Sequence, residues 1–508
     1  MPCAILHASL LFVALATSEA RSQAVSGRDG LEAGEYSVGF QLIEEQDHSR
    51  TVTGGVSPSR PHPRPIRTYL WYPARNSNDA RPMRFGDYAA LADDDIWPSE
   101  IVGPMRGKLK FARWLLARRL GPAGFDALLR QPVLAIENAE ALEGPFPLIV
   151  IGQGLYFEFP VSFAALAEYL AGRGFVVATC PLVGTNSPFV RIDALDLETQ
   201  VRDLEFVIAR VRRMSFVSPE RLGVFGFDMG GMAGLILTMR NSDVDAFVSV
   251  SSGIIYQHPS GLPGASSSYD PLALRAPWLH SMAASWMEQP PDSQSKSLFE
   301  TAVHAERFLL LTEGMDHFDY TSLALIEGPW NASDRDGIEG YKAVSRYIYN
   351  FFAAFLAQDP RSRGFIAQSP QESDPGSSMT LEHRPAAPAS ISYEEFVQAV
   401  VAGQADQAID ELRKLRETNP DHILLDDEYL RRLVSTVRTS WGLTEEAMPV
   451  IKLRAELYPT SVDAQQMLAE GYIDAGDFRA AIETYSALLE KNPDDSRIKS
   501  RLEWLRNQ

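Results

Sequence analysis

The sequence predicts an α/β fold, a mostly parallel sheet with helices on both faces, followed by an all-α region of helical repeats. Two observations predict it. Short apolar strands alternate with amphipathic helices from about Pro147 to Leu356, and a glycine–alanine–proline spacing recurs between residues 391 and 508. Alternating strands and helices are typical of a parallel sheet that is buried on both faces. At 508 residues, the chain is long enough for more than one domain.

The composition is that of a folded protein and excludes some functions. Hydrophobic residues make up 45% of the chain and charged residues 22%. A formal net charge of −19 argues against a nucleic-acid partner, because such proteins present a basic surface. No apolar run after the N-terminus reaches the roughly 18 residues that predict a membrane span. The nine histidines show no ligand spacing, so we expect no metal site.

The first 24 residues are typical of a signal peptide. An apolar run from Ala4 to Ala16 is followed by Ser22-Gln23-Ala24, a small-x-small cleavage site. The prediction is therefore a secreted or periplasmic protein. Cleavage would remove Cys3 and leave Cys180 as the only thiol, so no intrachain disulfide is expected.

Residues 25–357 are predicted to form the sheet-containing domain. It begins with β-rich segments between Gly34 and Ala74, on either side of a Pro- and Gly-rich loop at Gly54–Pro65. A helical, amphipathic insertion follows at about residues 87–138. Such an insertion is either a lid over a site or a helical flank, and the sequence leaves both open.

The core of this domain follows in strict alternation. Helices are expected at Phe163–Gly172, Leu195–Arg212 and Ile338–Leu356. Strands are expected at Leu148–Ile151, Phe175–Thr179, Leu222–Phe225, Ala246–Val250, Trp278–Ala283 and Phe308–Leu311. Residues 358–390 are rich in Pro, Ser and Gly and poor in large apolar side chains, which predicts a linker.

Residues 391–508 carry an internal repeat. Three glycines are each followed five residues later by alanine, and each alanine is followed twelve residues later by proline. These positions are Gly403, Ala408 and Pro420; Gly442, Ala447 and Pro459; and Gly476, Ala481 and Pro493. The pattern resembles the tetratricopeptide repeat, which has small residues at the inter-helix turn and at the helix crossing. The resemblance implies a concave surface for a protein partner, although three units could also simply cap the first domain.

The motif that indicates chemistry is Gly226-Phe227-Asp228-Met229-Gly230-Gly231. It follows a predicted strand and opens a helical stretch, the context of a nucleophile elbow, whose sharp turn projects one side chain above the sheet. Gly226 and Gly230 suit the close approach of backbone segments at such a turn. The motif does not fit G-x-G-x-x-G, so no dinucleotide cofactor is expected, and no other cofactor is indicated.

Chain order supplies the other candidate site residues. In an elbow-type site an acid follows a later strand and a histidine comes last. His317 follows the last predicted core strand, and the acid is expected at Glu288 or Asp292. The backbone N–H groups of Met229 and Leu155 are the candidate oxyanion-hole donors.

From about Gly34 to Leu356 the chain resembles the α/β-hydrolase fold, and within it the platelet-activating-factor acetylhydrolase and dienelactone-hydrolase-like group. The resemblance rests on the elbow, on His317-Phe318, and on Trp71-Tyr72-Pro73-Ala74, Gly144-Pro145-Phe146-Pro147 and Leu166-Ala167-Glu168-Tyr169-Leu170. It implies a hydrolase of a small ester or lactone. The chain departs from the group at two places: Asp228 replaces Ser or Cys, and Gln153 stands where a His-Gly pair is common.

An aspartate at the elbow leaves three interpretations. Asp228 could be a nucleophile, as in epoxide hydrolases and haloalkane dehalogenases, because a carboxylate with an ordinary pKa near 3.9 needs no base in order to attack. The segment between Asp228 and His317 is, however, too short for those enzymes' cap. Asp228 could instead be a general base for water in ester hydrolysis. Alternatively, the protein is a catalytically inactive hydrolase-fold scaffold whose repeats recruit a protein partner.

Overall fold

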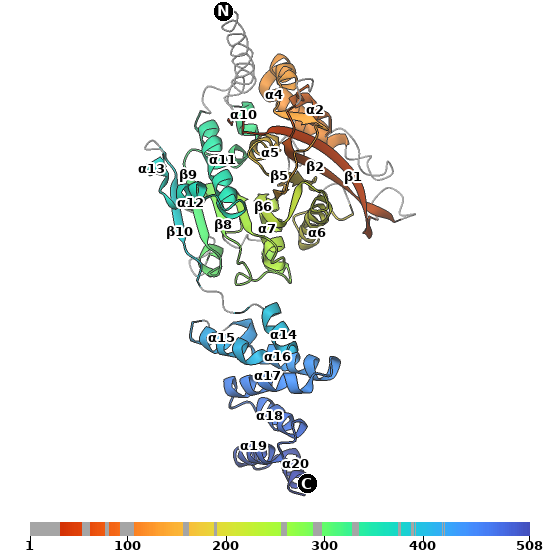
Figure 1. Cartoon of the computed structure of the whole chain (residues 1–508), viewed down its shortest axis with the longest axis vertical. Helices are drawn as coiled ribbons and strands as arrows, with labels where there is room; N and C mark the ends of the chain where they lie inside the picture. The colour runs from red at the N-terminus through yellow and green to blue at the C-terminus, as the bar shows by residue number, and fades with distance from the viewer. Residues whose placement is uncertain are drawn as a thin grey trace, which may run out of the picture. The chain divides into compact units, whose positions relative to one another are not determined.

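A computed structural model gives the fold shown in Figure 1. It describes residues 31–52, 61–76, 81–91, 106–155, 162–186, 190–255, 262–287, 297–327, 335–373, 377–387, 391, 393–418, 420 and 422–507. The chain divides into two compact units, Met1–Ala387 and Pro388–Gln508. The expected signal peptide lies outside the described residues. None of the described helices is long and apolar enough to cross a membrane.

The first unit is built on a ten-stranded sheet, in the order β10-β9-β8-β7-β6-β4-β5-β2-β1-β3 (Figure 1). The six central strands from β9 to β5 run parallel. They are β4 (Phe146–Gly152), β5 (Val176–Thr179), β6 (Val217–Phe227), β7 (Ala246–Val250), β8 (Trp278–Ala283) and β9 (Arg307–Thr312). This confirms the predicted mostly parallel α/β fold.

The helices cover the two faces of this sheet, as the alternation of its side chains requires. On β4, Ile149 and Ile151 pack on one face with α5 (Ala164–Ala171) and α11 (Arg335–Phe355). Their neighbours Leu148 and Val150 pack on the other face with α6 (Ala194–Val211) and α7 (Met229–Arg240). The apolar strands therefore contribute side chains to two hydrophobic cores, one on each face of the sheet.

The N-terminal segment extends the sheet at one edge. β1 (Ser37–Val52) and β2 (His62–Ala74) form a long antiparallel pair, and β2 lies antiparallel to β5. The region expected as a helical insertion contains α2 (Phe85–Leu91) and α4 (Arg106–Arg130), which is kinked at Gly121. It ends in the short edge strand β3 (Ala135–Glu137), which pairs with β1. A strand within this insertion was not predicted.

The prediction of a linker at residues 358–390 is wrong for the part that the structure describes. Helices α12 (Pro360–Ala367) and α13 (Pro370–Ser373) follow α11, and β10 (Thr380–Arg384) pairs antiparallel with β9. The strand was missed because its side chains are mostly polar. β10 is an edge strand with its charged side chains exposed, so it lacks the apolar pattern of a buried strand. The first unit therefore ends at Ala387 rather than at residue 357.

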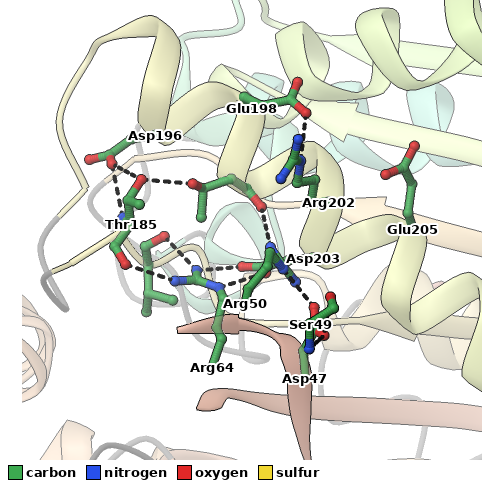
Figure 2. Close-up of polar contacts among 12 residues, drawn as sticks. Asp47, Ser49, Arg50, Arg64, Thr185, Asp196, Glu198, Arg202, Asp203 and Glu205 are labelled. Atoms are coloured by element: carbon green, nitrogen blue, oxygen red, sulfur yellow. Dashed lines mark hydrogen bonds and ion pairs between the residues drawn. The ribbon is translucent and has the colours of Figure 1, made fainter. Parts of the chain in front are cut away.

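A buried ion network joins the β1–β2 pair to α6 (Figure 2). The guanidinium of Arg64, on β2, donates to both carboxylate oxygens of Asp203 at 2.7 and 2.6 Å. Further N–H groups of Arg64 donate to the carbonyls of Val183 and Gly184, in the loop after β5. Arg50 also pairs with Asp203, at 2.8 Å. Buried charges persist when paired and hydrogen-bonded, so this network fixes the loop after β5.

The described residues of the second unit form helices joined by turns. Its helices are α14 (Tyr393–Val401), α15 (Ala405–Thr418), α16 (Asp427–Ser435), α17 (Thr444–Leu457), α18 (Val462–Asp474), α19 (Phe478–Lys491) and α20 (Ser496–Arg506). Gly403, Gly442 and Gly476 adopt positive φ angles between helices, a conformation that favours glycine. The three repeat alanines are buried where helices meet. The repeat spacing therefore predicted both features correctly.

Candidate functional site

The predicted elbow forms at the end of β6. Asp228 lies between β6 and α7 with φ 52° and ψ −120°, a backbone conformation that is strained for a residue with a side chain. Neighbouring glycines allow the turn, because a Cβ on Gly226 or Gly230 would lie 2.3 or 2.0 Å from backbone oxygens. Asp228 is the one residue of the turn that is only partly buried. Its carboxylate is therefore the group that the turn presents.

One carboxylate oxygen of Asp228 is already hydrogen-bonded. The backbone N–H of Leu155 donates to Oδ2 at 2.9 Å. Leu155 was predicted as an oxyanion-hole donor, and it lies in the loop after β4. Met229, the other predicted donor, is the first residue of α7, so its N–H belongs to the helix end that lacks intrahelical acceptors. Among the described residues, no hydrogen bond to the other oxygen, Oδ1, is found.

Gln153 supports the loop that carries Leu155. Its side chain is fully buried and donates from Nε2 to Thr179 Oγ1 and to the carbonyl of Cys180, both at 3.0 Å. The backbone carbonyl of Gln153 accepts a hydrogen bond from the side chain of Gln200, on α6, at 2.8 Å. Gly154 follows, and a Cβ there would lie 2.7 Å from Cβ of Asp228. Gln153, where the sequence departs from the group that it resembles, thus holds together the ends of the strands next to the elbow.

His317 lies at the elbow, where its imidazole contacts Phe227, the residue before Asp228. It follows β9 and leads into a short turn of helix at Phe318–Tyr320. Its imidazole stacks on the buried ring of Phe227, with 4.6 Å between centroids, and on Trp286, at 5.7 Å. Trp286 is 45% exposed and belongs to α8 (Ala284–Met287). Sequence reasoning missed both aromatic residues, since nothing in the local pattern ties them to His317.

Burial lowers the pKa of His317, and this effect outweighs the negative charges of Asp228 and Asp316, which raise it. The side chain is therefore a neutral imidazole near neutral pH. A neutral imidazole can accept a proton from water, which suits the role of a general base.

The Nδ1 atom of His317 is held by a residue that the sequence did not single out. Ser251 Oγ lies 2.8 Å from it. The two predicted acids, Glu288 and Asp292, lie outside the described residues. Ser251 is the first residue after β7, the strand next to β6, and this position is the only sequence signal that could have identified it.

Two pockets of the described surface lie away from this site. One of about 880 Å³ is lined by residues that follow β2 and by residues at and around α2 and β3, and one of about 390 Å³ is lined by α6, α7 and residues 262–267. Neither includes Asp228 or His317. No group of three or more His, Cys, Asp or Glu side chains is arranged to hold a metal ion in the part of the chain that the structure describes.

Comparisons with known proteins find two kinds of similarity. Residues 442–505 match the family model for the tetratricopeptide repeat, which confirms the predicted repeat over that range. Among solved structures, the chain is similar to a ferulic acid esterase from Streptomyces cinnamoneus, at 20% identity and a TM-score of 0.46. That match covers 65% of this chain and 92% of the esterase chain. A search of curated proteins finds no match.

Proposed function

We propose that this chain is a hydrolase in which Asp228 is the covalent nucleophile and His317 activates water. The hydrogen bond from Leu155 N–H to Asp228 Oδ2 supports this proposal most directly. It fixes one carboxylate oxygen and leaves Oδ1 to attack. The strained backbone of Asp228 adds support, because strain of about 1–3 kcal/mol persists at sites where it serves a function.

The arrangement suits substitution at a saturated carbon followed by hydrolysis. Oδ1 attacks the carbon of an epoxide-like substrate, the carbon–oxygen bond breaks, and the released oxygen takes a proton from water. An ester of Asp228 results. His317 then removes a proton from a second water, which attacks Cγ of Asp228. Negative charge develops on Oδ2, where the Leu155 N–H already lies. The Cγ–Oδ1 bond then breaks, and the leaving oxygen takes the proton from His317 to release the alcohol. The hydroxide left by the first step takes the proton of the Asp228 carboxyl group, which restores the carboxylate.

The same hydrogen bond disfavours direct attack on an ester carbonyl. Attack by a carboxylate there would give an anhydride, and the substrate oxygen would need the donor that Asp228 occupies. A small ester or lactone would require Asp228 to act as a base for water instead. We therefore place an epoxide-like substrate ahead of an ester or lactone. From the predicted signal peptide we also propose that the enzyme acts in the periplasm or outside the cell.

The test follows ¹⁸O from labelled water through a single turnover of an aryl epoxide. A covalent route places the label in the Asp228 carboxylate, because water attacks Cγ, whereas direct hydrolysis places it only in the product. Asp228→Asn should lower turnover by at least about 10³-fold. Its melting temperature should stay close to that of the wild type, because Asn keeps the shape and tolerates positive φ. Label found only in product, or unaltered activity in Asp228→Asn, would exclude a nucleophilic Asp228.

A catalytically inactive scaffold is the second candidate. The hydrogen bond from Leu155 to Asp228 also favours this candidate. The Asp228 carboxylate occupies the donor that a substrate oxygen would need, and it could do so permanently. The repeats would then recruit a protein partner. Here Asp228→Ser separates the candidates: a silent wild type beside a serine variant that hydrolyses short-chain aryl esters would mean that the fold is kept and catalysis is lost.

A further inference from the structure

Ser251 is held firmly at the edge of the sheet where the site lies. It directly follows β7, whose last residue, Val250, accepts a hydrogen bond from the backbone N–H of Asp228 at 3.3 Å. The backbone N–H of Ser251 donates to the carbonyl of Ser281, on the neighbouring strand β8, at 2.8 Å. The position of Ser251 is thus set by the same strand ends that carry Asp228.

Three properties of Ser251 are unusual for a serine at a strand end. Its φ angle is 44°, in a region that side-chain-bearing residues adopt at a cost. It is only 3% exposed. Its hydroxyl lies 2.8 Å from Nδ1 of His317, across 66 residues of sequence. A buried, strained residue that contacts the proposed base at its inner nitrogen indicates a function in placing that base.

We propose that Ser251 is the positioning residue of His317, holding Nδ1 in the place where a carboxylate stands in an acid–base–nucleophile triad. This inference rests on the proposed function of His317. The hydroxyl is too buried to reach a substrate, which excludes Ser251 as a nucleophile. It fixes the ring so that Nε2, the other nitrogen, is the atom left for water.

A hydroxyl differs from a carboxylate in charge. A carboxylate at Nδ1 would stabilise the imidazolium form, whereas a hydroxyl does so only weakly. Among the residues that the structure describes, the rings and hydroxyls in contact with His317 are those of Phe227, Trp286, Phe318 and Ser251, none of which is charged. The charged groups that act on it are Asp228 and Asp316. With a neutral hydroxyl rather than a carboxylate at Nδ1, burial stays the dominant effect and holds the pKa of His317 below its ordinary value.

The experiment measures the imidazole titration of His317 by NMR in the full chain, together with the pH dependence of kcat/KM. Ser251→Asp should raise the pKa of His317 by about 1 or more, because it adds a negative charge at hydrogen-bond distance. The acid limb of kcat/KM should move up by the same amount. Aspartate and asparagine also tolerate a positive φ, so the backbone is preserved.

Two further variants separate positioning from folding. Ser251→Ala removes the hydroxyl and should lower kcat by about 10-fold or more, with KM little changed, because a misplaced base loses part of its contribution. Ser251→Asn restores a polar partner without charge. It should therefore recover much of the lost kcat, and kcat/KM should fall at the same acidic pH as in the wild type. Equal losses in Ser251→Ala and Ser251→Asn would contradict the proposal.

The NMR titration also distinguishes this inference from the proposed function, since it needs no turnover. If the wild type has no activity but Ser251→Asp still raises the pKa of His317, the contact between Ser251 and His317 is supported and the proposed hydrolase activity is rejected. Glu288→Gln and Asp292→Asn serve as matched comparisons. If either shifts the His317 titration and Ser251→Asp does not, the Nδ1 partner is that acid and the inference is wrong.

Discussion

At the scale of single residues, the site differs from a serine–histidine–acid triad at two positions: a carboxylate, that of Asp228, stands where the hydroxyl is expected, and a hydroxyl, that of Ser251, stands where the carboxylate is expected. The elbow carries a carboxylate, and the inner nitrogen of His317 faces a hydroxyl. The carboxylate at the elbow and the hydroxyl beside His317 are consistent with one mechanism. In the proposed mechanism a carboxylate nucleophile needs no base to activate it, so His317 would serve only the later attack of water.

His280 allows a prediction about pH and stability. It is fully buried on β8 with Nδ1 2.7 Å from Ser249 Oγ, and burial lowers its pKa to about 3. The unfolded chain protonates this side chain below about pH 6.5 and the folded chain does not. Its contribution to stability is therefore complete above pH 6.5 and is lost as pH falls from 6.5 towards 3.

His280→Gln should remove this pH dependence. Between pH 7 and pH 5 the wild type is expected to lose about 2 kcal/mol of unfolding free energy through His280, at about 1.4 kcal/mol per pH unit below 6.5. Urea denaturation at the two pH values measures the loss. Ser249→Ala keeps the imidazole and should retain the loss. A variant at residue 280 with the wild-type pH dependence would contradict the assignment.

At the scale of elements, close backbone approach between β4 and α7 decides where the elbow lies. Gly230→Ala would place a Cβ 2.0 Å from the carbonyl oxygen of Gly152, so we expect a loss of about 3 kcal/mol or more in unfolding free energy. Gly364→Ala is the matched control. Gly364 lies inside α12 with open space around it, so alanine should stabilise by up to about 1 kcal/mol. Similar melting temperatures for the two variants would be incompatible with this packing.

The network around Arg64 makes a second prediction at this scale (Figure 2). Arg64→Met leaves Arg50 as the guanidinium that pairs with the buried Asp203, and it removes the donor to three loop carbonyls, those of residues 183–185. We expect a loss of about 3 kcal/mol, the lower end for breaking a buried pair. Arg202→Met, which breaks an exposed pair with Glu198 on the same helix, should cost less than about 1 kcal/mol. Chemical denaturation compares them, and equal losses would mean that burial adds nothing.

At the scale of the whole molecule, the boundary between the two units is the main correction to the sequence analysis. β10 supplies the last strand of the sheet, and Ile366 of α12 is 2% exposed within the core that α11 shares. A chain of residues 1–357 would lack both and would expose the edge of β9. The repeat unit has its own cores and its own ion pairs, such as those of buried Arg454 with Asp427 and Asp463.

Truncation tests this boundary. Residues 1–387 should stay folded with the same first melting transition as the full chain, since the sheet is complete. Residues 1–357 should aggregate or melt at a lower temperature. Size-exclusion chromatography and thermal unfolding measure both. A 1–357 fragment as stable as the 1–387 fragment would restore the boundary expected from composition.

A pulldown with residues 391–508 deleted would show whether the repeats recruit a partner.

The sequence alone determined the features that depend on neighbouring residues: the alternation of strands and helices, the elbow with Asp228, the order that places His317 last, and the glycine turns of the repeats. These follow from local periodicity and from backbone conformations that only certain residues tolerate. The tertiary structure decided what pairs across the chain: Ser251 with His317, Arg64 with Asp203, and polar β10 with β9. Such partners are brought together by sheet order, which no local pattern of residues encodes.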